Sequence, residues 1–451
     1  MDTPICDFVR RYAESNALRL HMPGHKGTAF LGMEPFDITE IDGADSLYEA
    51  SGIIHQSETN AGRLFGCSTF YATEGSSQCI RAMLYLAVQR GKAQGRKPLI
   101  AAARNVHKSF LSVCALLDLD VLWLYPEESM SYLSCEIRPE TLDARLRNAE
   151  QKPTAVYLTS PDYLGKVADI AGIAAVCRRH DVLLLVDNAH GAYLRFLEKS
   201  LHPIDLGADL CCDSAHKTLP VLTGGAYLHL SPAVEAELSP RAKNALSLFG
   251  STSPSYLILQ SLDAANGYLD RYRAKLQEFL PAVAMLKEML TRAGYCLYGQ
   301  EPLKITIAAK SYGYTGKEIA QYLLSHQIVC EFADLDYLVL MVTPEIPVED
   351  IRRLQDILLA LPARSPLPQG APAFRAGTKV LSIREAMLSS IVSIPVSESE
   401  GRILAAASVG CPPAVPILVC GERIDRHAIA CFQYYGVNAV AVVNEGDELQ
   451  Q

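Results

Sequence analysis

Short apolar runs alternate with amphipathic stretches between about residues 68 and 230, and this alternation is typical of parallel βαβ units. In the amphipathic stretches, such as 78–89 and 170–179, apolar residues recur at helical spacing. We therefore predict an α/β fold with a mostly parallel sheet covered by helices. The strands that we expect are 98–103, 121–125, 155–159, 182–187, 208–212 and 225–230.

The pattern changes after residue 255 and predicts a second kind of domain. A long helix over 256–293 is followed by shorter elements, which suggest a small α+β domain: strands 303–308, 328–332 and 337–342, and helices 316–325 and 348–361. A segment rich in Pro, Ala and Gly then indicates a linker. The domains that we expect are an N-terminal segment 1–60, a large domain 61–255, a linking helix with the small domain 256–362, the linker 363–377 and a C-terminal α+β domain 378–451.

The composition is that of a folded chain of several domains, because 49% of the 451 residues are hydrophobic and only 20% are charged. A net charge of -9 provides no positive field for nucleic acid or anionic lipid. We find neither a signal peptide nor an apolar run of membrane-spanning length. The 13 cysteines, Cys211 and Cys212 among them, form no CxxC pair and are expected to be small core residues. We expect a cytoplasmic protein without nucleic-acid or membrane partners.

The residues with chemical potential are concentrated in 183–196 and 207–228. One apolar run ends in Asp187, and the next expected strand is followed by Ser214, His216 and Lys217. Ligands of such sheets bind beyond the carboxyl ends of the strands, so a carboxylate and an amine should meet there. Pyridoxal phosphate requires both, since a lysine condenses with its aldehyde and a carboxylate keeps its pyridine nitrogen protonated. Asp187 and Lys217 fit these roles, although a lone lysine after a strand is usually only solvated.

Two further stretches offer partners for such a cofactor. Gly75, Ser76 and Ser77 open an expected helix and provide backbone N–H groups and hydroxyls for a phosphate, although glycine and serine before a helix often serve only as a cap. His107 follows the strand 98–103, where it either caps a helix or stacks on a cofactor ring opposite a small residue such as Ala189.

A series of motifs covers nearly the whole chain in order. The motifs are HMPGHKG at 21–27, DITEIDGADSLYEASGII at 37–54, ATEGSSQCIRAML at 72–84, RNVHKS at 104–109, SPDYLGKVADI at 160–170, VDNAHGAY at 186–193, DSAHKTLPVLTGGAYLH at 213–229, STSPSY at 251–256, SIREAM at 382–387 and GCPPAVPILVCGERI at 410–424. Through them the chain resembles the Orn/Lys/Arg decarboxylase family, whose members are fold type I (aspartate-aminotransferase-like) pyridoxal-phosphate enzymes. It resembles the short form, which lacks the N-terminal wing domain.

The resemblance implies a role for each matching residue. Lys217 would form the Schiff base with the cofactor, Asp187 would pair with the pyridinium nitrogen, and His107 would stack on the ring. The other implied contacts are Gly75, Ser76, Ser77, Ser214 and His216 around the phosphate, Ala189 and His190 near the ring, and Thr252 or Ser253 reaching the phosphate of a neighbouring subunit. A homodimer with shared active sites follows from the same resemblance.

The implied reaction is decarboxylation of a basic L-amino acid to an amine of polyamine biosynthesis and carbon dioxide. Arginine is favoured as the substrate, with lysine and ornithine close behind, and either Lys217 or His216 returns the proton. Asp42, Asp45, Glu49 and Glu385 are candidates for binding the charged end of the substrate. The chain departs from the usual family pattern at Ser76, a change that keeps the hydroxyl and should be tolerated. It also departs in the C-terminal region, at Cys411, Ala414, Val415 and Cys420, which puts substrate access and identity in doubt.

Three other interpretations were weighed. An aminotransferase or β-eliminating lyase of the same fold would clamp the substrate carboxylate with a late arginine, and Arg352 and Arg353 offer no clear clamp. A catalytically silent, regulatory paralogue is harder to separate from the sequence, although the cofactor-binding positions are retained. His21 and His25 have the spacing of helical zinc ligands, but Pro23 and Gly24 between them forbid a helix, so no metal is expected.

Overall fold

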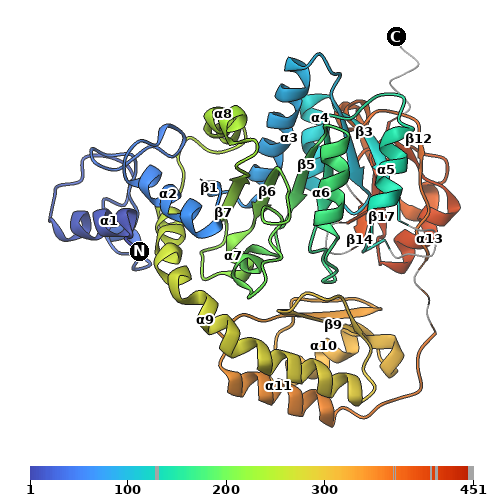
Figure 1. Ribbon diagram of the computed structural model, residues 1–451. Helices are drawn as coiled ribbons and strands as arrows, with labels where there is room; N and C mark the ends of the chain where they lie inside the picture. Colours follow the sequence, from blue (N-terminus) through green and yellow to red (C-terminus); the bar gives the residue numbers. More distant parts are fainter. Residues whose placement is uncertain (127–131, 369, 371, 407–408, 412–414, 445–451) are drawn as a thin grey trace. The chain divides into compact units, whose positions relative to one another are not determined.

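The computed structural model divides into two compact units, each built from two segments of the chain (Figure 1). Unit 1 comprises Met1–Arg90 and Ile170–Gln277, and unit 2 comprises Gly91–Asp169 and Glu278–Gln451. The structure describes all residues except 127–131, 369, 371, 407–408, 412–414 and 445–451. The first segment of unit 2 is therefore inserted in the sequence between the two segments of unit 1.

Unit 1 contains four strands in the order β1-β7-β6-β5. Their bounds are Ser68–Ala72 for β1, Leu183–Asp187 for β5, Leu210–Asp213 for β6 and Ala226–Leu230 for β7. The strands β5 and β6 are parallel, with Asp187 opposite Cys212. Every side chain of β5, β6 and β7 is buried, as expected for strands covered on both faces. The parallel pair brings the carboxyl ends of β5 and β6 to the same edge.

Helices of unit 1 begin and end at residues that favour these positions. The C-cap of α2 is Gly66, which has a φ of 73° and donates its N–H to the carbonyl of Gly62, as is usual where a helix ends in a left-handed residue. The helices are α1 (Pro4–Glu14), α2 (Ile53–Phe65), α6 (Ile170–Arg179), α7 (Ala215–Thr218) and α8 (Glu235–Ser247), while α3 (Ser76–Ala93) and α9 (Tyr256–Arg292) each continue into unit 2. The 3-10 helices are η1 (Glu34–Phe36), η2 (Leu47–Glu49) and η3 (Ala192–Phe196).

Unit 2 begins with three parallel strands in the order β4-β2-β3. Their bounds are Leu99–Ala103 for β2, Asp120–Leu124 for β3 and Ala155–Thr159 for β4. Helix α4 (Lys108–Leu117) connects β2 to β3, and α5 (Pro139–Arg147) lies between β3 and β4 in the sequence. This is the βαβ pattern that the sequence predicts, with each strand boundary within one residue of its expected place.

The second part of unit 2 is a small α+β arrangement with a sheet in the order β10-β11-β9-β8 (Figure 1). Its elements are β8 (Leu297–Tyr298), β9 (Lys304–Ala308), η4 (Ala309–Tyr312), α10 (Gly316–Ser325), β10 (Phe332–Ala333), β11 (Tyr337–Met341) and α11 (Val348–Ala360). The predicted strand 328–332 is wrong over most of its length. The N–H of Ile328 closes the end of α10 by bonding to Leu323 at 3.0 Å, and Val329 is 83% exposed, so this apolar run is not part of the ladder.

The C-terminal part of unit 2 is a further α+β arrangement with short antiparallel strand pairs. Its elements are β12 (Thr378–Lys379), α12 (Ile383–Leu388), β13 (Ile391–Pro395), η5 (Val396–Glu398), β14 (Val409–Cys411), β15 (Val415–Leu418), β16 (Glu422–Arg423), α13 (Arg426–Tyr434) and β17 (Ala439–Val443). Ile417, Phe432 and Val442 are fully buried in its core, which also takes in Leu133 and Leu164 from the first part of the unit. The C-terminal part is therefore packed against the first part of unit 2, which contains β2, β3 and β4.

Two features of unit 1 were not predicted. Strand β1 was missed because its sequence, STFYA, has no continuous apolar run. Strand β7 is antiparallel to β6, because the segment that joins them contains only the four-residue helix α7 and does not form a long crossover.

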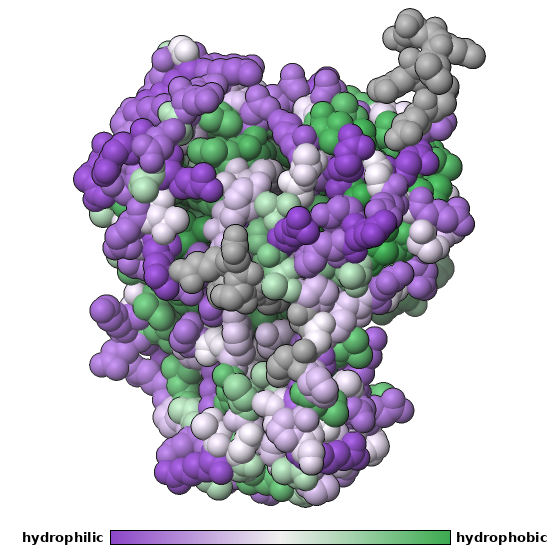
Figure 2. All heavy atoms as spheres, turned by 90° about the vertical axis from the view of Figure 1, so that its right-hand side faces the viewer, coloured by the Kyte–Doolittle hydropathy of each residue, from purple (hydrophilic) through white to green (hydrophobic). Residues whose placement is uncertain are grey.

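No helix among the described residues is long and apolar enough to cross a membrane. The face drawn in Figure 2 is mainly hydrophilic, with apolar side chains in separate patches.

Candidate active site

Asp187 lies at the carboxyl end of β5, where its side chain is 3% exposed. Its Oδ1 accepts the N–H of Ala189 at 3.2 Å, and the Cys212 thiol lies 3.7 Å from the same oxygen. The first contact holds the carboxylate in the turn that follows the strand. Cys212, which we expected to be an ordinary core residue, therefore borders a candidate functional group.

Lys217 lies in the short helix α7, four residues beyond the end of β6. Its Nζ is 3.0 Å from Nε2 of His190, which follows β5. The lysine is half-buried and His190 is 6% exposed. The structure thus brings together an amine and an imidazole that the sequence placed on neighbouring strand ends, and an ammonium at this position would donate to the imidazole.

Gly75, Ser76 and Ser77 form the N-terminal end of α3, as expected, although the helix begins at Ser76 rather than at residue 78. Gly75 has a φ of 70°, which favours glycine, and its N–H donates to Gly224 at 2.7 Å. Ser214 donates to the hydroxyl of Ser76 at 2.8 Å. N–H groups at a helix start, together with these hydroxyls, form a group of donors suited to an anion.

His216 lies beside this group of donors. Its ring atom Cε1 is 4.0 Å from the position that a Cβ on Gly75 would occupy. Nδ1 donates to the carbonyl of Gly225 at 2.9 Å, so neutral His216 presents Nε2 as an acceptor and donates there only as an imidazolium. The pKa of His216 is lowered, mainly because the side chain is partly buried. The hydrogen bond to Gly225 acts in the opposite direction, and the charge of Lys217 lowers the pKa further.

Thr252 and Ser253 lie in the exposed segment between α8 and α9. The N–H of Ser253 donates to Ser251 at 3.1 Å, and the N–H of Ser251 donates to Glu74 at 2.5 Å. The segment is therefore tied to the residue before Gly75. Its exposure leaves the two hydroxyls available to a partner, as the interpretation of a shared site requires.

His107 belongs to unit 2 and is the N-cap of α4. Its Nδ1 accepts the N–H of Ser109 at 3.2 Å and lies 2.9 Å from the hydroxyl of Ser109. The capping role that the sequence left open is thus confirmed. Capping holds the imidazole by Nδ1, and stacking of the ring on a cofactor stays a prediction.

Arg104, three residues before His107, forms a buried ion pair with the C-terminal part of unit 2. Its Nη2 lies 3.0 Å from Oε2 of Glu422, and the two side chains are 2% and 5% exposed. A second nitrogen donates to the carbonyl of Pro416 at 3.3 Å, and the guanidinium lies 5.1 Å from the ring centre of Trp123. The loop before His107 is therefore anchored to the C-terminal part.

The unusual C-terminal positions are only partly described. Ala414 and the prolines before it lie outside the described residues, as does the side chain of Cys411. Val415 is 8% exposed and Cys420 is 2% exposed, and burial is the main reason why the pKa of the Cys420 thiol is raised to about 12. Cys420 is thus a buried, protonated thiol near Glu422.

The residues of unit 1 fit pyridoxal phosphate in the kinds of group that they offer. The cofactor needs a carboxylate, an amine and an anion-binding group of N–H and hydroxyl donors, and these are Asp187, Lys217 and the group around Ser76 and Ser214. The positive φ of Gly75 and the open space beside it form a cradle that a side chain would narrow.

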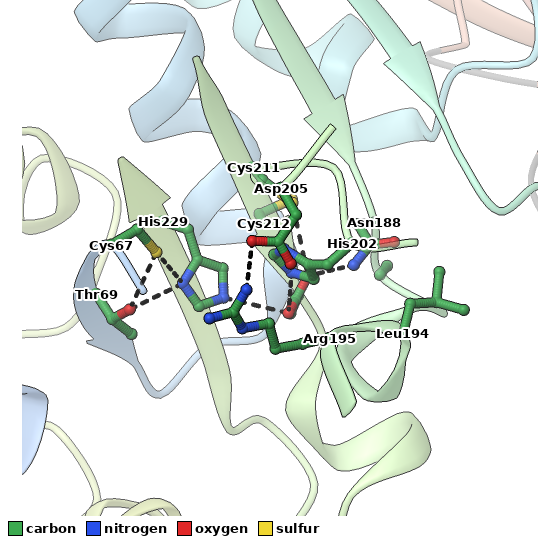
Figure 3. A network of polar contacts seen from close by, with 12 residues as sticks. Cys67, Thr69, Asn188, Leu194, Arg195, His202, Asp205, Cys211, Cys212 and His229 are labelled. Carbon is green, nitrogen blue, oxygen red and sulfur yellow. Dashed lines mark hydrogen bonds and ion pairs between the residues drawn. The ribbon is translucent and has the colours of Figure 1, made fainter. Parts of the chain in front are cut away.

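Sequence reasoning missed a buried polar network that includes Asn188, His202 and His229 (Figure 3). It centres on Asp213, which contacts all three. Asp213 and Asn188 stand within motifs that were recognised, next to residues to which roles were given. The available signal was the presence of Asp and His in otherwise apolar strands, since buried polar groups need partners.

Comparison with known proteins places these observations in context. The Orn/Lys/Arg decarboxylase major-domain model matches residues 3–301, and the C-terminal-domain model of the same name matches residues 378–442. Arginine decarboxylase of Halalkalibacterium halodurans is 29% identical over 95% of this chain and 92% of that protein. The uncharacterized protein YaaO of Bacillus subtilis is 30% identical over 95% and 93%.

Solved structures share the fold over almost the whole chain. Lysine decarboxylase LdcF of Francisella novicida has a TM-score of 0.79 and 17% identity, and the match covers 98% of this chain and 81% of that one. Lysine decarboxylase A of Pseudomonas aeruginosa has a TM-score of 0.80 and 17% identity, with 98% and 80% covered. Serine palmitoyltransferase of Sphingomonas wittichii matches with a TM-score of 0.55 and 15% identity, covering 80% and 83%. The predicted fold class is confirmed.

Proposed function

The chain belongs to the Orn/Lys/Arg decarboxylase family, and from this premise we infer that it uses pyridoxal phosphate to decarboxylate a basic L-amino acid, with arginine as the preferred substrate. The observation that carries the proposal is the contact of Lys217 with His190 beside the ends of β5 and β6. Catalysis at this point needs an amine with a proton acceptor in contact, and the structure has both.

We assign the aldehyde, the pyridinium nitrogen and the phosphate of the cofactor to residues of unit 1. Lys217 would bind its aldehyde carbon, Asp187 its pyridinium nitrogen, and Gly75, Ser76, Ser77 and Ser214 its phosphate. Ala189 and His190 would border the ring, and His107 would stack on it. When bound, the cofactor supplies an aldehyde that condenses with amines and a ring that accepts the electron pair left by departing carbon dioxide.

Residues of this chain can supply the proton that the reaction requires. After carbon dioxide leaves, the α carbon must gain one proton to become the methylene group of the amine product. Lys217 is the donor that the geometry favours, because His190 Nε2 is 3.0 Å from its Nζ and can pass a proton to it or take one from it. His216 is turned with Nδ1 toward Gly225 and suits the phosphate better, where a dianion would favour its protonated form.

Arginine as the substrate rests on relatives. Two of them, from Halalkalibacterium halodurans and Bacillus subtilis, are named arginine decarboxylase and are 29% and 28% identical to this chain. The structure narrows the acidic candidates for binding the guanidinium. The Asp45 carboxylate accepts the N–H groups of Gly52 and Ile54 at 2.7 and 3.1 Å, and Glu385 completes the N-terminal capping box of α12. Asp42 and Glu49 are exposed and remain candidates.

We also propose a homodimer, in which Thr252 or Ser253 would reach the partner's phosphate. The support is a run of large apolar side chains that unit 1 exposes near its N-terminus: Leu18 83%, Leu20 84%, Phe30 77% and Leu31 90%. Side chains of this size are rarely exposed together unless a partner covers them. Sedimentation of the wild-type chain should give twice the monomer mass, and Leu20→Glu with Phe30→Glu should give the monomer. The cytoplasmic location and the place in polyamine biosynthesis stay predictions.

The reaction is tested by incubating the protein and pyridoxal phosphate separately with arginine, lysine and ornithine. We expect carbon dioxide and the matching amine in equal amounts, fastest from arginine, and no product from Lys217→Ala. A keto acid in place of carbon dioxide would favour the aminotransferase, although Arg353 is already bonded to the carbonyl of His326. No turnover of any of the three, with the cofactor bound, would favour the silent paralogue.

A further inference from the structure

Asp213, the last residue of β6, is fully buried and contacts several polar side chains. Its Oδ2 lies 3.1 Å from Nε2 of His202 and 3.2 Å from Nε2 of His229. Its Oδ1 accepts Nδ2–H of Asn188 at 2.7 Å and is 3.6 Å from the thiol of Cys211. Both carboxylate oxygens are therefore satisfied by several donors, which come from different parts of unit 1.

The proton positions in the network follow from these contacts. Burial alone would raise the pKa of Asp213, but His202 and His229 outweigh it and hold that pKa below the ordinary range, so the group is a carboxylate and only accepts. Both histidines must then carry a proton on Nε2. Nδ1 of His229 lies 2.9 Å from the hydroxyl of Thr69, which donates to it when the ring is neutral. The outer end of the network is thus fixed to β1.

The inner end of the network connects the two strand ends that carry the cofactor groups. Asn188 directly follows Asp187, and its backbone N–H donates to the carbonyl of Cys212 at 2.9 Å. Asp213 directly precedes Ser214 and stands four residues before Lys217. The hydrogen bond from Asn188 to Asp213 therefore joins the end of β5 to the end of β6. Asp187 is the last residue of β5, and Lys217 lies in the helix that follows β6.

The side-chain amide of Asn188 is packed directly against Gly191. A Cβ on Gly191 would lie 2.0 Å from Oδ1 of Asn188 and 2.8 Å from Cδ1 of Leu194. Any side chain at this position would force the amide of Asn188 to move. Because Asn188 is completely buried, the amide has no solvent-filled space to move into and would leave Asp213.

We propose that Asn188 and Asp213 are positioning residues, whose hydrogen bond fixes the separation of Asp187 and Lys217 and so sets cofactor affinity and turnover. The inference rests on the roles of Asp187 and Lys217 in the proposed function. Neither positioning residue contacts the substrate. Residues that hold reacting groups in place act by keeping them within a few tenths of an ångström of the productive geometry, so loss of one such bond affects binding and rate together.

A metal site is the competing interpretation of the same atoms. A ring nitrogen of His202, the sulfur of Cys211 and a carboxylate oxygen of Asp213 lie within 4.8 Å of one another. Hydrogen bonding accounts for the arrangement better, because the amide N–H of Asn188 points at the carboxylate, as it would toward an acceptor and not toward a cation.

The test compares Asn188→Ala with Thr69→Val. Both remove one hydrogen bond of the same network, but only the first removes the connection between the two strand ends. For Asn188→Ala we expect the dissociation constant of pyridoxal phosphate to rise about tenfold or more, with kcat reduced and KM for the amino acid little changed. For Thr69→Val we expect a lower denaturation midpoint in the cofactor-free protein and cofactor affinity within about twofold of the wild-type chain.

Gly191→Ala provides a second variant, because it displaces the Asn188 amide without removing it. It should reproduce the loss of cofactor affinity seen with Asn188→Ala. If Asn188→Ala and Thr69→Val weaken cofactor binding equally, or if neither does, the network is only structural and the inference is overturned. A stoichiometric divalent metal in the purified protein, lost in Asp213→Asn, would overturn it as well. Full turnover in Lys217→Ala would instead sink the proposed function, so the two failures are distinguishable.

Discussion

Unit 1 and unit 2 each contain a buried carboxylate, Asp213 and Glu422, and the charges of the two are compensated in different ways. Asp213 in unit 1 has several partners, none of them a lysine or an arginine: His202, His229, Asn188 and Cys211. Among the described residues of unit 2, Glu422 forms an ion pair with one cation, Arg104, and also accepts the N–H of Val419 at 2.8 Å. Asp213 stands four residues before Lys217, and Arg104 stands three residues before His107.

The difference concerns what remains when one partner is removed. Arginine does not lose its proton in a protein, so Arg104 without Glu422 is a buried charge with no counter-ion. A histidine can be neutral, and Asp213 without one donor keeps the others. Removing the partner of Arg104 should therefore greatly lower the free energy of unfolding. Removing one of the several donors to Asp213 should lower it less.

The largest effect is expected for Glu422→Ala. It leaves the guanidinium of Arg104 buried and uncompensated, which should lower the free energy of unfolding by about 3–5 kcal/mol in urea denaturation. The control is Arg104→Met combined with Glu422→Leu, which removes both charges and should recover most of the loss. A loss below about 1 kcal/mol in Glu422→Ala would show that water reaches Arg104 and would end the comparison.

The next effect is expected for His202→Leu in the Asp213 network. The change removes one of two Nε2 donors from a buried carboxylate, and the free energy of unfolding should fall by about 1–3 kcal/mol. Urea denaturation of the cofactor-free protein measures it. A loss as large as that of Glu422→Ala would mean that the remaining donors do not share the charge, contrary to the contrast drawn between the two carboxylates.

How far these features can be predicted depends on the range of the contacts. Asp187 and Lys217 were found from the sequence because each stands next to an apolar strand and its chemistry is recognisable locally. The boundaries of β4, α6 and α10 were predicted to the residue for the same reason. The roles of Asp187 and Lys217 toward the cofactor stay predictions.

The Asp213 network and the Arg104–Glu422 pair were not predicted because they join residues that are distant in the sequence. Arg104 and Glu422 are 318 positions apart, and Thr69 and His229 are 160 apart. No local pattern announces such a pair. The antiparallel direction of β7 was missed for a related reason, since the apolar run of a strand contains no information on the direction of its neighbour.

A smaller effect is expected from pH in the Asp213 network. Burial lowers the pKa of His229 despite the opposing effect of Asp213, so the unfolded chain takes up a proton at a pH where folded His229 does not. Stability should fall as the pH drops below about 6.5, the ordinary value for histidine. The pKa of Asp213 is lowered, so its contribution is present above about pH 4 and is lost only below it.

Urea denaturation of the wild-type chain and of His229→Asn, at pH 7 and pH 5, measures the contribution of His229 to this pH dependence. Asp213 remains charged at both pH values, and the other titrating groups are common to both proteins. We expect the wild-type chain to lose more stability than His229→Asn between the two. An equal loss would show that His229 binds its proton equally well in the folded and unfolded states.

The smallest effect is expected where the same charges meet at the surface. Lys97 and Asp120 of unit 2 form an ion pair at 3.1 Å, like Arg104 and Glu422, but their side chains are 69% and 44% exposed. Asp120 also faces Lys379 at 3.5 Å, so it keeps a cation when Lys97 is removed. Lys97→Ala should change the free energy of unfolding by no more than about 0.5 kcal/mol, because water replaces the lost partner. A cost near that of Glu422→Ala would mean that charge pairing, and not burial, sets the energy of both pairs, since the two differ mainly in exposure.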